Sequence, residues 1–361
     1  MKFLAKIALL LVLAAAAAAA WFWISIERPY QDFPPEGVFV DLPRGASSRA
    51  VARLLQRNGV IRSATTFEIY ARRHPRRKLQ AGEYLFNHAI TGHDVFWQIA
   101  DGHVYEQPFT VREGATMFDI ARELEAAKFM TAEQFLAAAK TPELVRDIAP
   151  HVKTLEGFLF PATYALPRHP AAAELTAEMV RKFREEWTRM IATSQIAPGS
   201  GLTEHIVTLA SLVERETPKP EERPLVAGAF ENRLHKNMRL QCDPTVIYAL
   251  EQLGRYQGSL TGEDLHFDSP YNTYENSGLP PGPIGNPGEA SLRAAMAPAP
   301  TAYLYFVANT EGGHFFAATL EEHNRNVTKY RRLLAGLPAD PPAAPEIAKK
   351  SQGKRHKGTA R

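Results

Sequence analysis

Two glutamates end an apolar stretch whose spacing is that of a helix. Glu214 and Glu216 follow Leu209–Val213, and a polar turn that contains Pro218 and Pro220 comes directly after them. Burial raises the pKa of a carboxyl group, and a carboxyl group that keeps its proton near neutral pH can act as a general acid. The stretch therefore indicates acid catalysis, and the plain alternative is a pair of solvated glutamates at a helix end.

The two carboxylates are not equivalent. At about 100° per residue, side chains two positions apart differ by roughly 200° around a helix and do not face each other. A two-carboxylate glycosidase needs both groups to flank one bond, which this spacing does not allow. Glu216 continues the more apolar stripe, so we expect it to be the catalytic acid, with Glu214 as a secondary candidate.

Around this pair stands a series of short motifs in a fixed order. They are Leu155–Pro161 with Thr163 and Tyr164, Ala210–Thr217, Asn232–Leu234, Leu240 with Gln241, Asp243–Tyr248, Tyr271–Tyr274, Gly278–Ile284, Asn286–Gly288, Tyr303–Ala308, Gly312–His314, and His323 with Asn324. The series resembles the endolytic murein transglycosylase family, also called YceG-like, from the N-terminal apolar run to about residue 335. Cys242 is a departure from the family pattern, in which Ser or Thr is expected.

The resemblance implies a lytic transglycosylase that cuts the β-1,4 bond between N-acetylmuramic acid and N-acetylglucosamine inside nascent peptidoglycan strands and so limits their elongation. The C6 hydroxyl of the muramoyl ring attacks its own C1 and leaves a 1,6-anhydro end. Because this nucleophile is tethered, one glutamate suffices as acid and then as base. No cofactor is implied, and peptidoglycan synthases are further candidate partners.

Several polar and aromatic residues are candidates for binding the glycan. We expect Gln241 and Asp243 to position a substrate hydroxyl or Glu216. Aromatic faces pack on sugar rings, and amides and hydroxyls bind N-acetyl groups. The candidates for the groove on these grounds are Tyr271, Asn272, Thr273 and Tyr274. Glu156 and Asn324 are secondary candidates, and pairing with an arginine to brace the fold is the alternative role for Glu156.

An uncharged run at the N-terminus predicts a membrane anchor. Ile7–Ile26 is long enough to span a bilayer, Lys2 and Lys6 precede it, and Trp21–Trp23 form an aromatic end. The positive-inside rule places the short N-terminus in the cytoplasm and the rest outside, at the bacterial inner membrane. A cleaved signal peptide is the alternative.

The predicted fold class is α+β. The expected order is a cytoplasmic N-terminus (1–6), a transmembrane helix (7–26), a linker (27–37), a LysM-like βααβ module (38–105), a mainly helical lysozyme/transglycosylase-like catalytic domain with a β-hairpin (106–338) and a disordered basic tail (339–361). A structural spacer is the alternative for the LysM-like module. Asp243 is the predicted N-cap of a helix that ends at Gly254, and residues 268–288 are expected to form an irregular loop.

Composition excludes other classes. The net charge is only +3, so the protein as a whole has no strong positive potential that would attract nucleic acid. A single cysteine forms no internal disulfide, and no Cys/His spacing typical of a metal site occurs. The alternatives that remain are a muramidase that hydrolyses the same bond, a wall-binding membrane protein without activity, and a pyridoxal-phosphate lyase. The anchor argues against the last of these.

Overall fold

The computed structural model describes residues 2–194, 196 and 201–339. The chain divides into two compact units. Unit 1 comprises Met1–Val111, Ala126–Met130 and Ala162–Ala171, and unit 2 comprises the remainder. The basic tail expected at 339–361 lies outside the described residues except for its first position.

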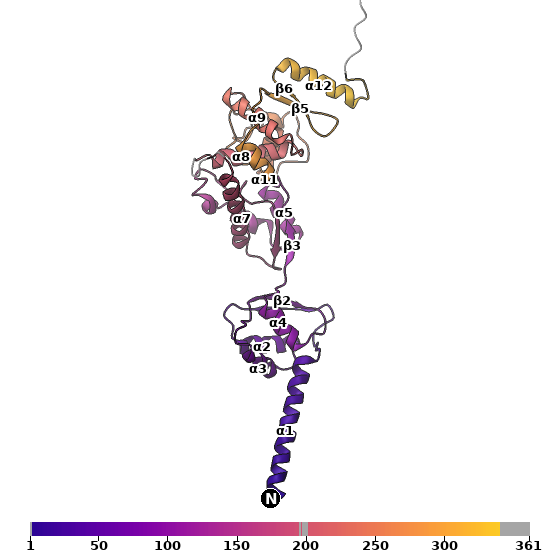
Figure 1. The fold of residues 1–361 in the computed structure, drawn as a ribbon. Helices are drawn as coiled ribbons and strands as arrows, with labels where there is room; N and C mark the ends of the chain where they lie inside the picture. Colours follow the sequence, from indigo (N-terminus) through magenta and orange to yellow (C-terminus); the bar gives the residue numbers. More distant parts are fainter. Residues whose placement is uncertain (1, 195, 197–200, 340–361) are drawn as a thin grey trace, which may run out of the picture. The chain divides into compact units, whose positions relative to one another are not determined.

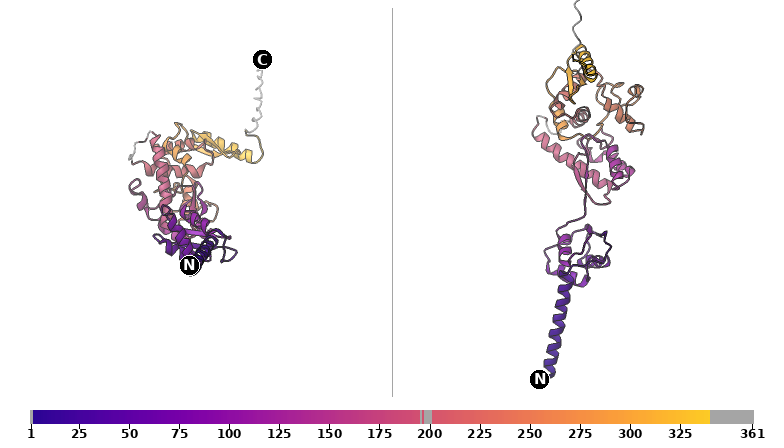
Figure 2. Two further views of the ribbon diagram at one scale, coloured as in Figure 1. Left: turned by 60° about the horizontal axis from the view of Figure 1, so that its bottom comes forward. Right: turned by 90° about the vertical axis from the view of Figure 1, so that its right-hand side faces the viewer.

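The N-terminal apolar run is one long helix, α1 (Lys2–Glu27). Ala5–Glu27 is long and apolar enough to cross a membrane by length and composition, and Figures 1 and 2 show the helix as continuous. Its last turn is buried in unit 1, where Ser25 and Ile26 are 4% and 2% exposed. The guanidinium of Arg73 lies 5.4 Å from the centre of the Phe22 ring. The C-terminal turn of the apolar helix therefore packs within unit 1.

Unit 1 is built on a βααβ pattern, followed by a further helix. The elements are β1 (Val38–Leu42), α2 (Ser48–Arg57), α3 (Ala64–Arg73), β2 (Gly82–Phe86) and α4 (Gly92–Ala100). β1 and β2 pair antiparallel, with Val40 opposite Tyr84. The hydroxyls of Ser47, Ser63 and Thr91 cap the three helices. The core contains Val40, Leu42, Val51, Ala52, Leu55, Val60, Phe67, Tyr84, Phe86, Val95, Phe96 and Ile99.

The segment expected as a linker packs along unit 1. Tyr30 forms a β-bridge with Ile90, and the backbone NH of Asp32 donates to the Gly59 carbonyl at 3.0 Å. Gly59 has φ +70°, and a Cβ there would lie 2.0 Å from the Asp32 carbonyl oxygen. Only glycine fits at this close approach.

A second small sheet also belongs to unit 1. β3 (Gln107–Thr110) pairs antiparallel with β4 (Thr163–Leu166), and Phe109 packs edge-on against Phe129 at 5.8 Å between ring centres. Unit 1 thus includes residues beyond position 105, where the LysM-like module was expected to end.

Unit 2 is mainly helical. Its helices are α5 (Met117–Ala126, the last residue of which falls in unit 1), α6 (Ala132–Ala139), α7 (Ala172–Ala192), α8 (Thr203–Glu216), α9 (Arg223–His235), α10 (Asp243–Glu251), α11 (Glu289–Met296) and α12 (Leu320–Leu334), with 3-10 turns η1 (Pro142–Val145) and η2 (Asp264–His266). α8 is the central helix, since every residue from Ile206 to Val213 is buried and α9, α10 and α11 pack against it.

A hairpin and a helix close the described part of unit 2. β5 (Tyr305–Ala308) pairs with β6 (His314–Ala317), and α12 packs beside both strands (Figure 1). Thr319 caps α12 by accepting from the Glu322 backbone NH at 3.2 Å, and the Glu322 carboxylate accepts from Ala318 NH. The helix-rich α+β class with small sheets behind one apolar helix is confirmed.

The prediction for the start of α10 was wrong by one residue. Cys242 occupies the N-cap position without a side-chain cap bond, and Asp243 is the first helical residue. The Asp243 carboxylate accepts a hydrogen bond from the Tyr274 hydroxyl instead of capping the helix. α10 also ends at Glu251, three residues before the expected Gly254.

Candidate functional site

Glu216 is the last residue of the buried helix α8 and faces a small cavity. The cavity has a volume of about 200 Å³ and is lined by Glu216, Phe230, Arg233, Leu240, Gln241, Asp243, Tyr274 and Phe306. These residues come from α8, α9, the turn before α10, the first residue of α10, the loop that follows α10, and β5. The structure therefore brings Glu216 together with Gln241, Asp243 and Tyr274, which the sequence predicted as site residues.

The surroundings of Glu216 favour its protonated form. Burial raises the pKa of this carboxyl above its ordinary value, and the negative charge of Asp243 acts in the same direction. A hydrogen bond from Cys242 and the charges of His314 and Arg233 oppose the rise. The net direction is upward, so the group is suited to donate a proton.

The Cys242 thiol is the hydrogen-bond partner of Glu216. Its Sγ donates to Glu216 Oε1 at 2.9 Å, and the cysteine is 1% exposed. Burial and the neighbouring carboxylate raise the pKa of this thiol well above its ordinary value. The group therefore stays a neutral thiol and is no candidate nucleophile, because the thiolate is the reactive form.

Gln241, Asp243 and Tyr274 form the polar wall of the cavity. Gln241 adopts φ +52°, and its backbone NH donates to the Thr273 carbonyl at 3.1 Å. Tyr274 donates its hydroxyl to Asp243, and burial raises the pKa of Tyr274, with this hydrogen bond adding to the rise. The Asp243 carboxylate is thus already held by a neutral hydroxyl.

The other residues of the Tyr271–Tyr274 motif support the loop and lie outside the lining of this cavity. Asn272 is fully buried and donates to the carbonyls of Leu265 and Phe267. Thr273 is 1% exposed, and its hydroxyl accepts from the Cys242 backbone NH at 3.0 Å. Tyr271 packs against Tyr248 with 5.0 Å between ring centres.

Glu214 points away from the cavity into an ion pair. Its Oε1 lies 2.8 Å from Arg223, and the two side chains are 5% and 7% exposed. Oε2 accepts from the Gly288 backbone NH at 2.9 Å. Glu214 therefore ties α8 to α9 and to the start of α11, which is a structural arrangement.

Glu156 lies in a buried hydrogen-bond cluster of its own. Its oxygens accept from the Met117 NH at 3.1 and 3.0 Å and from Asn286 Nδ2 at 2.8 Å. Asn286 Oδ1 also accepts from the backbone NH groups of Gly157 and Leu159. Burial raises the pKa of Glu156 to about 8. These hydrogen bonds connect the turn at 156–159 to α5 and to the loop before α11.

Sequence reasoning missed two contributors. Arg233 of α9 lines the cavity and donates hydrogen bonds to the carbonyls of Leu240 at 2.6 Å and Leu304 at 2.5 Å. His314 contacts the Glu222 carboxylate at 2.7 Å and adds to the field at Glu216. Both residues lie in motifs of the series described above, and this membership could have identified them as site residues. Asn324 is exposed on α12 and does not line the cavity.

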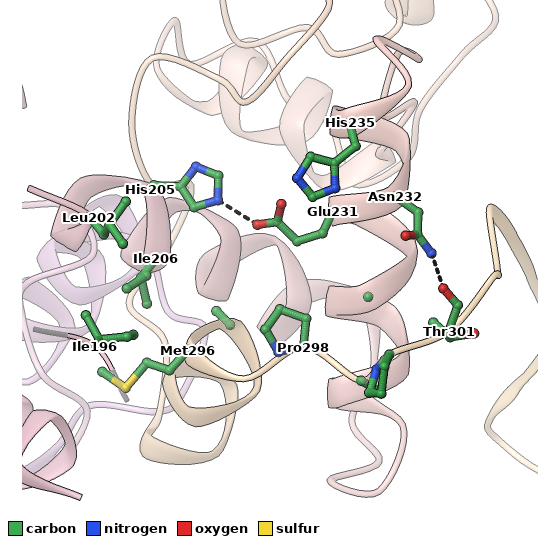
Figure 3. Close-up of a pocket in the computed structure, with 14 residues that line it drawn as sticks. Ile196, Leu202, His205, Ile206, Glu231, Asn232, His235, Met296, Pro298 and Thr301 are labelled. Carbon is green, nitrogen blue, oxygen red and sulfur yellow. Dashed lines mark hydrogen bonds and ion pairs between the residues drawn. The ribbon is translucent and has the colours of Figure 1, made fainter. Parts of the chain in front are cut away.

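A second, larger cavity is lined by other residues of α9 and lacks a comparable acid (Figure 3). It measures about 390 Å³ and is bordered by His205, Ile206, Glu231, Met296 and Pro298 among others. Glu231 lies 2.6 Å from His205, and this hydrogen bond lowers the pKa of its carboxyl. A carboxyl group in that state is a poor proton donor near neutral pH. Among the described residues, no group of three or more His, Cys, Asp or Glu side chains could hold a metal ion.

The fold and the cavity together define an α+β protein that carries an apolar N-terminal helix and one carboxyl group poised as an acid. The chain belongs to the YceG-like family, whose model matches residues 40–329. It is 32% identical over 323 residues to an endolytic murein transglycosylase of Bacillus subtilis, covering 85% of this chain and 88% of that protein.

Two further relatives agree. An endolytic murein transglycosylase of Streptococcus pneumoniae is 32% identical over 325 residues, covering 81% of this chain and 58% of that longer protein. The crystal structure of a YceG-like protein from Listeria monocytogenes superposes with a TM-score of 0.53 at 32% identity, covering 81% of this chain and 99% of that one.

Proposed function

We propose that the chain is a membrane-anchored endolytic lytic transglycosylase of peptidoglycan, with Glu216 as its catalytic acid and base. The observation that carries this proposal is the position of Glu216 in the cavity, with a raised carboxyl pKa and no ion-pair partner among the described residues. Family membership gives the substrate, because the relatives are named murein transglycosylases.

The reaction uses one carboxyl group twice. Glu216 donates its proton to the oxygen that leaves from C1 of N-acetylmuramic acid, and the glycosidic bond breaks. The C6 hydroxyl of the same ring forms a new bond to C1 and gives its proton to the Glu216 carboxylate. The acid is regenerated, no water is consumed, and the new end is a 1,6-anhydro sugar. The tethered hydroxyl supplies a high effective concentration of nucleophile.

The cavity wall supplies contacts for the sugar. Tyr274 presents an aromatic ring, and Gln241 an amide, beside Glu216. Asp243, held by the Tyr274 hydroxyl, orients a substrate hydroxyl. The roles of Tyr271, Asn272 and Thr273 are indirect, because their contacts shape the loop that carries Tyr274.

The anchor suggests where the enzyme works. In the proposed arrangement α1 crosses the bacterial inner membrane once with its N-terminus in the cytoplasm, and the two units lie outside. A domain tethered there meets newly made glycan strands and the synthases that produce them. Cleavage inside such strands limits their length.

Unit 1 is proposed to act as a LysM-like glycan-binding module. Its βααβ pattern supports this role, as does a hollow of about 610 Å³ between the β1–α2 turn and the segment that leads from α3 to β2. Gly45, Ser47, Arg77 and Gln80 are among the residues that line it. Binding of glycan oligomers to wild-type protein and to a variant altered at Gln80 tests this role.

A muramidase is the second candidate function, because Asp243 is a second carboxylate in the cavity. Product analysis separates the two reactions. Full-length protein in detergent is incubated with isolated glycan strands, and the fragments are weighed by mass spectrometry. We expect 1,6-anhydro ends on both short and long fragments. Reducing ends throughout would identify a hydrolase, with Asp243 as the candidate base to test next.

A further inference from the structure

The turn that carries Cys242 is held rigidly from both sides. The backbone NH of Cys242 donates to Thr273 Oγ1 at 3.0 Å, and the Thr245 hydroxyl donates to the Cys242 carbonyl at 2.7 Å. Gln241 before it is fixed in a left-handed conformation by its bond to the Thr273 carbonyl. The position of Sγ relative to Glu216 is therefore set by the scaffold and not by a free rotation of the chain.

The hydrogen bond between the two side chains has a definite direction. A neutral thiol donates its proton, and Glu216 Oε1 accepts at 2.9 Å. In a protonated carboxyl group the carbonyl oxygen is the better acceptor and the other oxygen carries the proton. With Oε1 occupied by the thiol, the transferable proton resides on Oε2.

We propose that Cys242 is a positioning residue for Glu216, whose thiol fixes Oε1 as an acceptor and leaves Oε2 to exchange the proton with the substrate. The inference rests on the proposed function, in which Glu216 is the general acid. It gives a role to Cys242, which stands where the family pattern predicts Ser or Thr. All three side chains offer a donor at the same place.

The other groups that face Glu216 do not replace this bond. Arg233 from α9, Asp243 from α10 and Tyr274 from the following loop line the cavity with it, and His314 from β6 contributes its charge. Within the described part of the chain, Cys242 is the side chain that donates a hydrogen bond to the Glu216 carboxylate. After the proton leaves, the same S–H supports the resulting anion.

A thiol is a weaker hydrogen-bond donor than a hydroxyl, so the residue type at position 242 adjusts the pKa of Glu216. A stronger donor stabilises the Glu216 carboxylate more and lowers the pKa of the acid. Loss of the donor raises that pKa and frees the carboxyl group to rotate. The identity of residue 242 therefore sets the pH above which Glu216 no longer carries its proton.

The test compares Cys242→Ala, Cys242→Ser and Cys242→Val in the full-length protein, where valine fills the space without a donor. We measure the pH dependence of kcat and KM for release of anhydro-ended fragments. Alanine and valine are expected to lower kcat about 3- to 10-fold with little change in KM, and to move the alkaline limb upward by roughly half a pH unit or more. Serine is expected to restore kcat and move that limb downward.

Infrared titration of the Glu216 carboxyl band, assigned by difference from Glu216→Gln, gives a readout that does not need turnover. If wild type releases anhydro ends but the alanine and valine variants match it in pH profile and in titration, the inference is overturned and the function stands. If wild type makes no anhydro ends, the proposed function fails, and the titration still decides whether Cys242 controls this carboxyl. Thermal unfolding of each variant identifies any loss due to misfolding.

Discussion

At the scale of single residues, Glu214 and Glu216 show how two positions on one helix acquire different roles. Glu214 contacts a buried arginine and a backbone NH, which oppose the rise in pKa that burial causes. Glu216 contacts a thiol and lines a cavity, and burial raises its pKa without an ion-pair partner in the described part of the chain. The helical azimuth that separates them was readable from the sequence, but the partners were not, because they come from segments up to 74 residues away.

Replacing the two glutamates by glutamine separates these roles. Glu216→Gln keeps the fold and loses at least ~100-fold in strand cleavage, because it removes the transferable proton. Glu214→Gln removes the 2.8 Å partner of buried Arg223 and leaves it the exposed Glu113 at 3.7 Å, so it destabilises the fold on the order of 3 kcal/mol, while folded protein stays active. Cleavage assays below the unfolding temperature of each variant make the comparison. An active Glu216→Gln beside an inactive, folded Glu214→Gln would reverse the assignment.

At the scale of elements, the irregular loop 268–288 is the part that builds the site. It brings Tyr274 to the cavity and leads into Asn286, which binds the turn at 156–159 and Glu156. The carboxyl of Glu156 is fully buried, and its pKa is raised from 4.5 to about 8. The loop has no regular secondary structure, and buried polar contacts hold it in place.

Glu156 makes the stability of the fold depend on pH. A carboxyl group whose folded-state pKa is raised contributes stability below its unfolded pKa of about 4.5, and this contribution is lost as pH rises toward about 8. The free energy of unfolding of wild type should fall across this window. Glu156→Gln keeps an acceptor oxygen and cannot ionise, so its fall should be shallower. Denaturant titrations at pH 5 and pH 8 measure both slopes, and parallel slopes would remove Glu156 as the cause.

Helices and strands were predictable from the sequence where the hydrophobic periodicity and the capping or turn residues indicate the same element. The N-terminal apolar helix, the βααβ order that begins at residue 38 and the β-hairpin of unit 2 appear as the sequence predicted. The cap at Asp243 was misplaced because a long-range hydrogen bond from Tyr274 competes for its carboxylate. Asn272 and Thr273 have side chains typical of sugar binding, and only tertiary contacts reveal that these side chains form hydrogen bonds to neighbouring segments of the protein.

At the scale of the whole molecule, α1 belongs to unit 1. The last turn of α1 is buried against the unit, and the following segment packs along it. A cleavage within the alanine run would leave this buried turn attached, so the burial itself does not depend on the membrane part. The long uncharged stretch and the aromatic end of α1 favour a retained anchor.

Intact mass of protein extracted from membranes tests whether the anchor is retained. We expect the mass to include residues 7–26, with partition into the detergent phase and resistance of the membrane-bound form to high salt. A mature N-terminus in or just after the alanine run would make the protein a soluble exported enzyme.

The central claim is that Glu216 drives a transfer to a tethered hydroxyl and not to water. Cleavage of glycan strands in H₂¹⁸O by the full-length protein tests this most directly, with Glu216→Gln as the inactive control. The account predicts new ends that contain no ¹⁸O and weigh one water less than reducing ends. Incorporation of one ¹⁸O at each cut would contradict it and establish hydrolysis.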